Sequence, residues 1–572
     1  DKNSCTLNFI TKTNPKLGEP GKDFKILYKF GSTEQESNSI TIDSSSSYKE
    51  GFPVSCRIVD LEGNELAKLE LEDEYFIWDN PKVNTGSQYE NGQKGAIVEL
   101  FGWPYDDIAE ECVWLGKAGY MAVKIFPPNE SILTTDTVED GELNPWWFLY
   151  QPVSYRLKSR MGDKKQLKNM INICRQNNVR VYADAVINHM AGNGNDMYWD
   201  HRNSAGSCVH WGPKNGSAGS PWWTTGWQYE NNPYTEKRPG LEFPSVPYFA
   251  SDFHCERSLN SWTDGNILNY GWLTGLTDLN TEKEYVRQRI ADYLTELISI
   301  GISGVRIDAA KHIFPESLAQ IFKRLKDNLG GGDLPEDFTA YLEVLFGGEK
   351  DLLMCGGSDY SFGSPFVSKL KNAGLSDSDV DKIKIWGSDY PKEFPICGYW
   401  EITPERHAIG LDCHDDQNPG SSSRDMGDKG SVYIKEKNIE KHRNFNIEMF
   451  TRTDANWKIK LLLSSYSFMN NGGAGFPDGL SDCHNCTGEQ CKKECSKSVP
   501  YQKAYDPNSR GYDTGNGDNW KEGTYTRVHR DIQIVNAMRS WMGLAPLNEK
   551  TLYGDENIIL IPLTENGVDY FD

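Results

Sequence analysis

Hydrophobic and polar positions follow two different patterns along the chain, and the first covers residues 1–88. Short apolar or alternating runs are separated there by Gly, Pro and Ser; these runs are Cys5–Ile10, Phe24–Phe30 and Val54–Val59. Short strands joined by polar turns are typical of a small β-sandwich. We therefore expect an N-terminal β-rich domain, in which Cys5 and Cys56 lie on strands and could link two strands or the two sheets.

From Ala96 onward, short apolar runs alternate with helical periodicity. The runs that predict buried strands are Ala122–Phe126, Val181–Val186, Gly304–Ala309, Tyr341–Leu345 and Ala408–Asp412. Apolar residues at helical spacing predict helices over Leu167–Cys174, Val286–Ile298 and Leu318–Leu325. Repeated strand–helix units predict an α/β protein, either a barrel or a doubly wound sheet. Residues 191–271 interrupt this rhythm, and we expect them to form a subdomain inserted after the third strand.

Carboxylates stand at or just beyond the C-terminal ends of several predicted strands, namely Asp184, Asp308, Glu343 and Asp415. A charge at the end of a buried strand is costly unless it faces a cleft or a partner, and in a closed barrel these ends form the rim of the active site. Carboxylates that meet at such a rim are suited to cleaving a glycosidic bond, with one as nucleophile, one as proton donor and one supporting the distorted sugar.

Arg306 precedes Asp308 by two residues, so both side chains point to the same face of the predicted strand. We expect the guanidinium to lower the pKa of Asp308 and keep it ionised as a nucleophile. Glu343 stands between two apolar residues with no cation nearby in the sequence, and we expect a dry site that keeps it protonated, as a general acid requires. The alternative is that Arg306 and Asp308 form only a buried ion pair.

Charge and cysteine content narrow the class of protein. Lys and Arg number 60 and Asp and Glu 82, and the net charge of −22 argues against a nucleic acid as partner. No stretch approaches the roughly 20 continuous apolar residues of a membrane helix, so we expect no membrane span. The 13 cysteines favour secretion into an extracellular or lumenal space. N-glycosylation sequons at Asn129, Asn215 and Asn485 are compatible with that location.

Four cysteines lie close together in the sequence: Cys483, Cys486, Cys491 and Cys495. We expect two local disulfides, with a small zinc site as the alternative. The odd total leaves at least one thiol unpaired, and Cys413 is the candidate. Nearness in the sequence further pairs Cys208 with Cys255 and Cys355 with Cys397.

Four segments together resemble the signature segments of α-amylases in glycoside hydrolase family 13. They are Asp184–Met190, Gly304–His312, Tyr341–Leu345 and Leu411–Gln417. Asn144–Tyr155 resembles the animal-type branch of that family, and the similarity extends over Gly95–Leu547. It implies a catalytic (β/α)8 TIM barrel over residues 89–190 and 272–547, and retaining endo-hydrolysis of α-1,4-glucans such as starch or glycogen.

The resemblance also implies roles for individual residues. Asp308 would be the nucleophile, Glu343 the general acid/base, and Asp415 the second carboxylate, which binds and distorts the sugar. Substrate-binding residues at the matching positions are Trp146, Trp147, Tyr150, Gln151, His189, Arg306, Lys311 and His414. Their types fit the task, because aromatic faces stack on sugars and imidazoles donate to hydroxyl groups.

One structural calcium ion is the implied cofactor. The matching ligands are Asn188, Asp278 and the backbone carbonyl oxygens of Asn269 and His312, and oxygen donors suit this hard cation. The ion would tie the inserted subdomain (residues 191–271) to the barrel. A disulfide between Cys112 and Cys174 is implied as well.

Departures from the family pattern carry further expectations. Animal-type α-amylases hold an activating chloride with an Arg, an Asn and a second basic residue; Arg306 matches the first, but Cys413 and Gly473 occupy the other positions, so we expect no chloride. The segment Asn418–Phe450 is long and polar compared with relatives. Residues 548–572 leave room only for the start of a C-terminal β domain, whose exposed strand edge would permit self-association.

Three alternatives stay open from the sequence. A barrel of the same family could be a catalytically silent binding scaffold, although no carboxylate is lost here. A transferase that passes glucan chains to sugar acceptors shares the covalent intermediate. The N-terminal domain could bind starch through its aromatic residues, or only pack on the barrel; the aromatic residues concerned are Phe24, Tyr28, Phe30 and Trp78.

Overall fold

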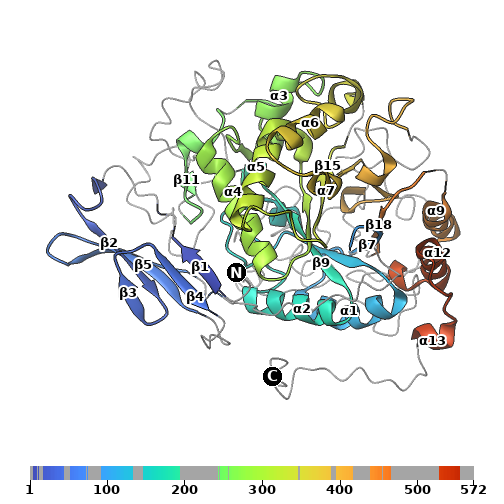
Figure 1. Ribbon diagram of the computed structural model, residues 1–572, viewed down its shortest axis with the longest axis horizontal. Coiled ribbons are helices and arrows are strands. Elements are labelled where there is room, and N and C mark those ends of the chain that lie inside the picture. Colours follow the sequence, from blue (N-terminus) through green and yellow to red (C-terminus); the bar gives the residue numbers. More distant parts are fainter. Residues whose placement is uncertain are drawn as a thin grey trace, which may run out of the picture. The chain divides into compact units, whose positions relative to one another are not determined.

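The computed structural model of the chain divides into two compact units. The first comprises Asp1–Pro81 with Ser299–Gly301, and the second Lys82–Ile298 with Ile302–Asp572 (Figure 1). The residues that the structure describes are 4–9, 11, 17–43, 52–71, 74, 92–132, 146–192, 242–243, 245–255, 257–345, 348–387, 395–416, 439–453, 455–464 and 527–553.

The first unit consists of two antiparallel sheets. The four-stranded sheet has the order β3 (Thr33–Gln35), β2 (Lys25–Phe30), β5 (Val54–Val59) and β6 (Glu65–Glu70), and the second sheet pairs β1 (Ser4–Asn8) with β4 (Ser39–Asp43). Tyr28, Phe30 and Val54 of the larger sheet form a core against which Leu7 and Ile40 of the smaller sheet pack. Two sheets that share one apolar layer are the β-sandwich-like arrangement that the alternating runs predict.

The structure bears on two possibilities left open for this unit. Phe24, Tyr28 and Phe30 are all buried, so their rings offer no face to a starch chain; Tyr28 and Phe30, at alternating positions of β2, belong to the core of this small unit instead. Cys56 forms no disulfide, so it links neither strands nor sheets. Its Cα partners on the neighbouring strands are Tyr28 and Leu69. Trp78 lies outside the described residues.

The second unit contains a closed barrel of parallel strands, which confirms the predicted (β/α)8 fold. In chain order its strands are β7 (Gly95–Glu99), β8 (Ala122–Ile125), β9 (Arg180–Ala185), β14 (Gly304–Ile307), β15 (Thr339–Glu343), β16 (Ile383–Trp386), β17 (His407–Gly410) and β18 (Ile459–Leu463). The five apolar runs that predict strands all lie in this barrel. Three barrel strands, β7, β16 and β18, are not among the predicted runs.

Helices cover the barrel or cap its connections. They are α1 (Tyr105–Ala118), α2 (Lys164–Gln176), α3 (Gly265–Tyr270), α4 (Glu284–Ser299), α5 (Pro315–Asn328), α6 (Ser364–Asn372), α7 (Asp377–Asp381), α9 (Ile439–Thr451), α12 (Ile532–Met542) and α13 (Glu549–Tyr553). Helix α2 begins at a capping box, in which the Asp163 side chain accepts from the Gln166 amide and Gln166 reaches back to the amide of Asp163. The predicted apolar stripes of α2 and α5 are buried.

Short elements connect these parts. The strands are β10 (His189–Met190), β11 (Glu242–Phe243), β12 (Tyr248–Phe249) and β13 (Thr277–Asp278). The short helices are η3 (Trp146–Tyr150), η6 (Ala250–Asp252), η7 (Leu273–Gly275), η8 (Ala310–His312), η9 (Asp351–Cys355), η11 (Pro404–Arg406), η12 (His414–Asp416) and η14 (Val528–Arg530). None of the helices among the described residues is long and apolar enough to span a bilayer.

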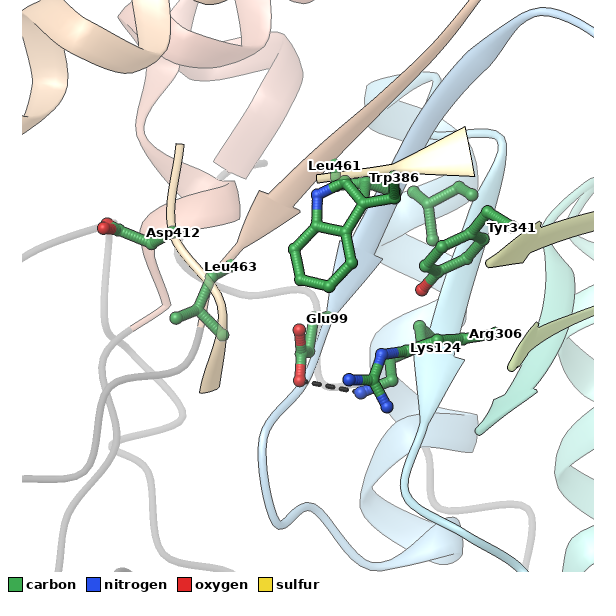
Figure 2. A pocket seen from close by; sticks show the side chains of 9 residues that line it. Glu99, Lys124, Arg306, Tyr341, Trp386, Asp412, Leu461 and Leu463 are labelled. Atoms are coloured by element: carbon green, nitrogen blue, oxygen red, sulfur yellow. Dashed lines mark hydrogen bonds and ion pairs between the residues drawn. The ribbon is translucent and has the colours of Figure 1, made fainter. Parts of the chain in front are cut away.

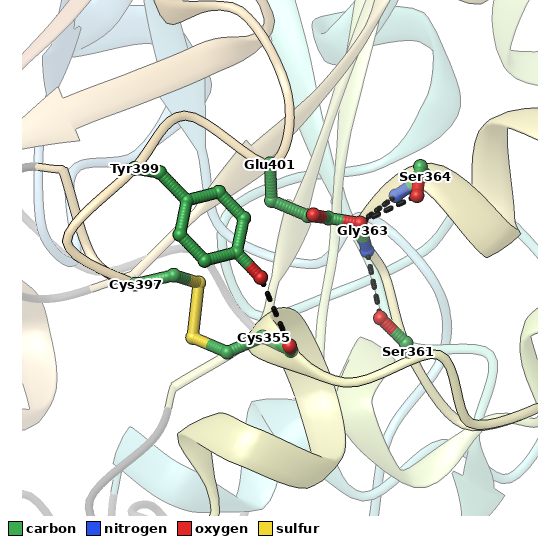
Figure 3. The surroundings of a disulfide bond; sticks show 7 residues. All are labelled: Cys355, Ser361, Gly363, Ser364, Cys397, Tyr399 and Glu401. Atoms are coloured by element: carbon green, nitrogen blue, oxygen red, sulfur yellow. Dashed lines mark hydrogen bonds between the residues drawn. A yellow bond between two sulfur atoms is a disulfide. The ribbon is translucent and has the colours of Figure 1, made fainter.

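Two predicted disulfides are confirmed. Cys112–Cys174 joins α1 to α2, which lie side by side (Figure 1). Cys355–Cys397 joins the end of η9 to the segment that precedes β17, where the Tyr399 hydroxyl donates to the carbonyl of Cys355 over 3.2 Å (Figure 3). Cys255 is disulfide-bonded too, but its predicted partner Cys208 lies outside the described residues.

The structure describes only some of the remaining predicted features, which concern glycosylation, the C-terminal segment and the cysteine cluster. Asn129 is fully buried and donates to the carbonyl of Glu130, so it cannot accept a glycan. Residues Glu549–Tyr553 form α13, so the predicted C-terminal β segment does not begin there. The remaining features lie outside the described residues: the predicted edge strand beyond Tyr553, the cluster Cys483–Cys495, the sequons at Asn215 and Asn485, and Gly473.

Candidate active site

Three of the four predicted rim carboxylates meet at one guanidinium. Nη1 of Arg306, on β14, lies 2.7 Å from Oδ1 of Asp184 and 2.8 Å from Oδ1 of Asp308. Nη2 of the same side chain donates to Oε1 of Glu343. Barrel closure explains the convergence, because Arg306 is in register with Asp184 on β9 and with Tyr341 on β15.

The fourth carboxylate, Asp415, reaches this site through a histidine. His414 Nε2 lies 3.7 Å from Oδ1 of Asp415, and His414 Nδ1 lies 2.7 Å from Oε1 of Glu99, the last residue of β7. The imidazole of His414 therefore lies between a carboxylate of the barrel interior and the predicted sugar-binding carboxylate.

In the turn after β14, the backbone N–H of Ala309 points toward Glu343. Ala309 adopts a left-handed conformation with φ 48° and ψ 33°, which is strained for a residue with a Cβ atom. Its N–H donates to Oε2 of Glu343 over 2.7 Å. Glu343 is thus held at both oxygens, and the expectation that it lies away from cations is wrong, because Arg306 comes to it from the neighbouring strand.

The electrostatics of Asp308 also differ from the expectation. Burial and the negative charges of Glu343 and Asp184 raise the pKa of Asp308 to about 7, against the opposing effect of Arg306. The guanidinium lowers this pKa but does not outweigh burial and the two neighbouring carboxylates, because its charge is shared among three buried carboxylates. Three carboxylates this close together hold a proton up to a higher pH than three separate carboxylates do.

A second buried cation connects the cluster to Glu99. Nζ of Lys124, on β8, lies 2.9 Å from Oε1 of Glu99 and 2.8 Å from Oδ2 of Asp184. The Tyr150 hydroxyl donates to that same oxygen of Asp184 over 2.8 Å. Although burial disfavours the ammonium, the two carboxylates raise the pKa of Lys124. Glu99 and Lys124 are not among the residues predicted from the sequence; the signal present there is a Lys inside the apolar run Ala122–Phe126.

A small cavity lies inside the barrel beside these charges, with room for about one water molecule. Glu99, Lys124 and Arg306 point into it from three strands, as Figure 2 shows. Its other lining residues are Ile97, Tyr341, Trp386, Asp412, Leu461 and Leu463. A space this small holds solvent and not a sugar ring, so any glucan must bind above it, at the rim.

The predicted aromatic contacts cluster at η3. Trp147 is half-buried, and its ring meets Phe148 edge to face at 4.7 Å. Tyr150 is buried and stacks on His414, with ring centroids 5.1 Å apart. Gln151 Oε1 accepts from the Gly192 amide over 3.2 Å. The side chain of Trp146, the first residue of η3, lies outside the description.

Two further predicted substrate residues are buried and tightly held. His189 Nε2 lies 3.0 Å from the carbonyl of Tyr150, and burial lowers the pKa of His189 to about 4, so its imidazole is neutral. Lys311 Nζ donates to the carbonyl of Leu345 over 2.8 Å and to Glu349 over 3.0 Å.

The exposed ring of Trp262 lies next to this lysine. Its centroid is 4.6 Å from Lys311 Nζ, and 42% of the residue is exposed. An exposed indole beside a rim lysine has the shape of a sugar-stacking surface. Trp262 is not among the predicted site residues, because it lies in the irregular segment 191–271.

The four predicted calcium ligands come from adjoining segments. β10 pairs with β13 so that His189 is in register with Asp278, which brings Asn188 close to that carboxylate. Asn269 donates through Nδ2 to the carbonyl of Lys311 over 3.1 Å, and His312 Nδ1 lies 2.9 Å from the carbonyl of Leu268.

Two buried oxygens in this group suit a hard cation. Oδ1 of Asp278 and Oδ1 of Asn269 find no hydrogen-bond donor among the described residues, and such oxygens call for a ligand. Among the described residues, no group of three or more His, Cys, Asp and Glu side chains is arranged to hold a metal ion. A calcium site built from one carboxylate, side-chain amides and backbone carbonyls does not require such a group.

The family model and two of the relatives that match this chain all carry the name α-amylase. The description "Alpha amylase, catalytic domain" matches residues 150–343. An "Alpha-amylase" of Phaedon cochleariae is 33% identical over 339 residues, which are 58% of this chain and 59% of that protein. An "Alpha-amylase" of Hypothenemus hampei is 30% identical over 394 residues, 68% of each chain. The chain thus spans about three fifths of the length of the first of these relatives.

A solved structure with the same fold is that of wild-type alpha-amylase I from Eisenia fetida. It is 20% identical, has a TM-score of 0.50, and the match covers 82% of this chain and 80% of that one. At this identity the likeness bears on the fold and not on the reaction.

Proposed function

The chain belongs to the α-amylase family, and from this premise we propose that it hydrolyses internal α-1,4-glucosidic bonds of starch-type or glycogen-type glucans with retention of configuration. The observation that carries the proposal is the meeting of Asp184, Asp308 and Glu343 on Arg306 at the rim. Carboxylates that share a guanidinium and retain a proton supply both partners of glycoside cleavage, an acid and a nucleophile.

In the first step, Glu343 gives its proton to the glycosidic oxygen while an oxygen of Asp308 attacks the anomeric carbon. The bond to the leaving oxygen breaks as the bond to Asp308 forms, which leaves a covalent glycosyl-enzyme. In the second step, Glu343 removes a proton from water, whose oxygen attacks the same carbon and releases Asp308. Two inversions at that carbon retain its configuration.

The remaining rim residues bind and orient the sugar. Asp415 and His414 accept from and donate to sugar hydroxyls beside the scissile bond, and charged partners make these hydrogen bonds strong. Trp147 and Trp262, both partly exposed, stack on the apolar faces of neighbouring rings. Tyr150 acts chiefly on Asp184, to which its hydroxyl is committed.

We further propose one structural calcium ion, held by Asn188, Asp278, Asn269 and His312. The two buried oxygens without donors, Asp278 Oδ1 and Asn269 Oδ1, support this assignment. The amide oxygen of Asn269 is as suitable as its backbone carbonyl. A bound Ca²⁺ takes no part in bond cleavage; it would fasten the loop before β13 to β10 and η8.

Secretion is proposed from the disulfides. Cys112–Cys174 and Cys355–Cys397 are both formed, and structural disulfides persist in oxidising compartments outside the cytosol.

The test is the size distribution of products released from amylose over time. The wild-type chain is expected to give mid-sized malto-oligosaccharides early, and Asp308→Asn none. Asp327→Asn, an exposed aspartate near the end of α5, is the matched control and should act like wild type. Products longer than the substrate would indicate a transferase, and the absence of any product from every variant would indicate a binding scaffold.

A further inference from the structure

His414 is held in one orientation by groups from several elements. Its ring stacks with Tyr150, at a centroid distance of 5.1 Å and an interplanar angle of 20°, and with Phe101, at 6.0 Å and 17°. Phe126 meets the ring edge at 6.1 Å. These aromatic contacts fix the imidazole plane, and the contact of Nδ1 with Glu99 decides which nitrogen faces which partner.

The two nitrogens face two carboxylates. Nδ1 lies 2.7 Å from Oε1 of Glu99, and Nε2 lies 3.7 Å from Oδ1 of Asp415. Both can be served at once only if the ring carries a proton on each nitrogen, since a neutral imidazole has a single N–H donor. The ring between them is 3% exposed, so water does not replace either partner.

The other charges around His414 come from neighbouring strands. Lys124 on β8 lies between Glu99 and Asp184 and keeps both carboxylates paired. Asp184 on β9 in turn binds Arg306. Glu99 therefore joins His414 to the carboxylate cluster through Lys124 and Asp184.

We propose that Glu99 is a positioning residue of the active site: it holds His414 as an imidazolium with Nδ1–H donated to Glu99 and Nε2–H directed at Asp415 and the bound sugar. The effect on sugar binding rests on the proposed function, whereas the state of His414 does not. Glu99 touches no substrate, because it lies below the rim beside a cavity that holds about one water molecule.

The electrostatics support this geometry. Although burial disfavours the imidazolium, the charges of Asp415 and Glu99 raise the pKa of His414 above its usual value, against a smaller opposing effect of Lys124. Burial alone would raise the pKa of Glu99, but Lys124 and His414 outweigh it and hold this pKa far below its usual range. The two cations thus favour the ionised form of Glu99.

The first test is a titration of His414 in the full chain, followed by NMR after labelling histidine at Cε1. The protein contains 10 histidines, and the resonance that disappears in His414→Gln assigns the signal. The wild-type midpoint is expected above about 6.5, the value of an unperturbed histidine. In Glu99→Gln it should fall by about one pH unit or more, because the amide keeps the shape but loses the charge.

Glu401→Gln is the matched control. Glu401 is also a hydrogen-bonded glutamate, but its partner is Ser364 and not a histidine, so the His414 midpoint should not move. A wild-type midpoint below about 6.5 would overturn the proposal, even if Glu99→Gln fails to fold. So would an unchanged midpoint in folded Glu99→Gln.

The second test is the pH profile of kcat/KM on a malto-oligosaccharide. The alkaline limb in Glu99→Gln should move toward acid by the same interval as the His414 midpoint, and Glu99→Asp, which keeps the charge, should restore most of it. Loss of stability alone would lower activity at every pH without moving the limb. If the midpoint moves but no variant hydrolyses any glucan, the proposed function fails and the role of Glu99 in holding His414 stands.

Discussion

Nη1 of Arg306 lies 2.8 Å from Oδ1 of Asp308, but that nitrogen also serves Asp184 at 2.7 Å. The guanidinium therefore neutralises Asp308 only in part. Burial and the nearby carboxylates outweigh it, and the pKa of Asp308 rises from 3.8 to about 7. The raised pKa of Asp308 bears on the stability of the fold, and the donors that hold Glu343 bear on its role in catalysis.

The stability of the fold should depend on the ionisation of Asp308. A carboxyl whose pKa is raised on folding favours the fold below its unfolded pKa near 4, and this contribution is lost as the pH rises through about 7. Asp308→Asn does not titrate, so it should gain stability relative to wild type between pH 5 and pH 8. Only the interval from pH 5 to the folded pKa of about 7 contributes, so at about 1.4 kcal/mol per pH unit the gain is at most about 3 kcal/mol.

Urea denaturation at pH 5 and pH 8 measures this difference, with Asp327→Asn as a control that should follow wild type. If Asp308→Asn instead loses stability relative to wild type as the pH rises, Arg306 dominates the ionisation of Asp308, as expected from the spacing of the two residues in the sequence.

The catalytic consequence concerns Glu343, which receives donors from Arg306 and from the Ala309 amide. Glu343→Gln keeps a side chain of the same shape but has no acidic proton to give to a leaving oxygen. Its activity on amylose should fall by about 10²–10⁴-fold, the usual contribution of general acid–base catalysis. A malto-oligosyl fluoride, whose leaving group needs no proton, should lose far less of its rate of glycosylation.

Single-turnover release of fluoride distinguishes the two roles. Asp308→Asn should be inactive on both substrates, because it lacks the nucleophile. Equal losses on amylose and on the fluoride in Glu343→Gln would rule out a proton-donating role for Glu343.

Part of the fold and of the site could be predicted because the signals are local. Val181–Val186 and Gly304–Ala309 read as strands from their own residues, and the period of two places Arg306 and Asp308 on one face. Cys355–Cys397 could be paired because the two residues lie only 42 positions apart with no cysteine between them.

The rest depends on closure of the barrel. Glu99 and Lys124 come from β7 and β8 and meet Asp184 only when these strands pair, so no spacing in the sequence joins them. The pKa of Asp308 depends on charges from three strands and could not be read from Arg306 alone. Phe24, Tyr28 and Phe30 left two alternatives open for a different reason: aromatic residues at alternating positions of a strand serve a core as readily as a sugar-binding surface.

Removal of calcium should destabilise the barrel unit. If Asp278 and Asn269 hold the ion, chelation with EDTA will lower Tm, and added Ca²⁺ will restore it, because a ligand at 100 times its Kd stabilises by about 2.7 kcal/mol. Asp278→Asn removes the one carboxylate of the site, so its Tm should respond little to either treatment. Mg²⁺, which demands a tighter octahedral site, is the control ion and should restore less.

Calorimetric titration of the EDTA-treated chain gives a readout apart from activity. One Ca²⁺ per chain is expected for wild type. A Tm that is indifferent to EDTA, together with no heat of binding, would exclude the site.

Activity should not depend on chloride. Both terminal nitrogens of Arg306 already serve carboxylates, and the adjoining cavity is lined by Glu99 and Asp412 as well as by Lys124. An anion placed there would be repelled by buried carboxylates at short range, which is costly where the local dielectric constant is low. Cys413, at a position where chloride-binding relatives carry an Asn, is buried and supplies no positive charge.

The measurement is the rate of amylose hydrolysis after exhaustive dialysis, with chloride or nitrate then added at constant ionic strength. Equal rates in all samples are expected. A several-fold rise on adding chloride would mean that an anion does reach Arg306, and that a carboxylate must leave it to make room. Glu99→Gln tests the role of this repulsion, because removing one of the repelling charges should make any response to chloride larger and never smaller.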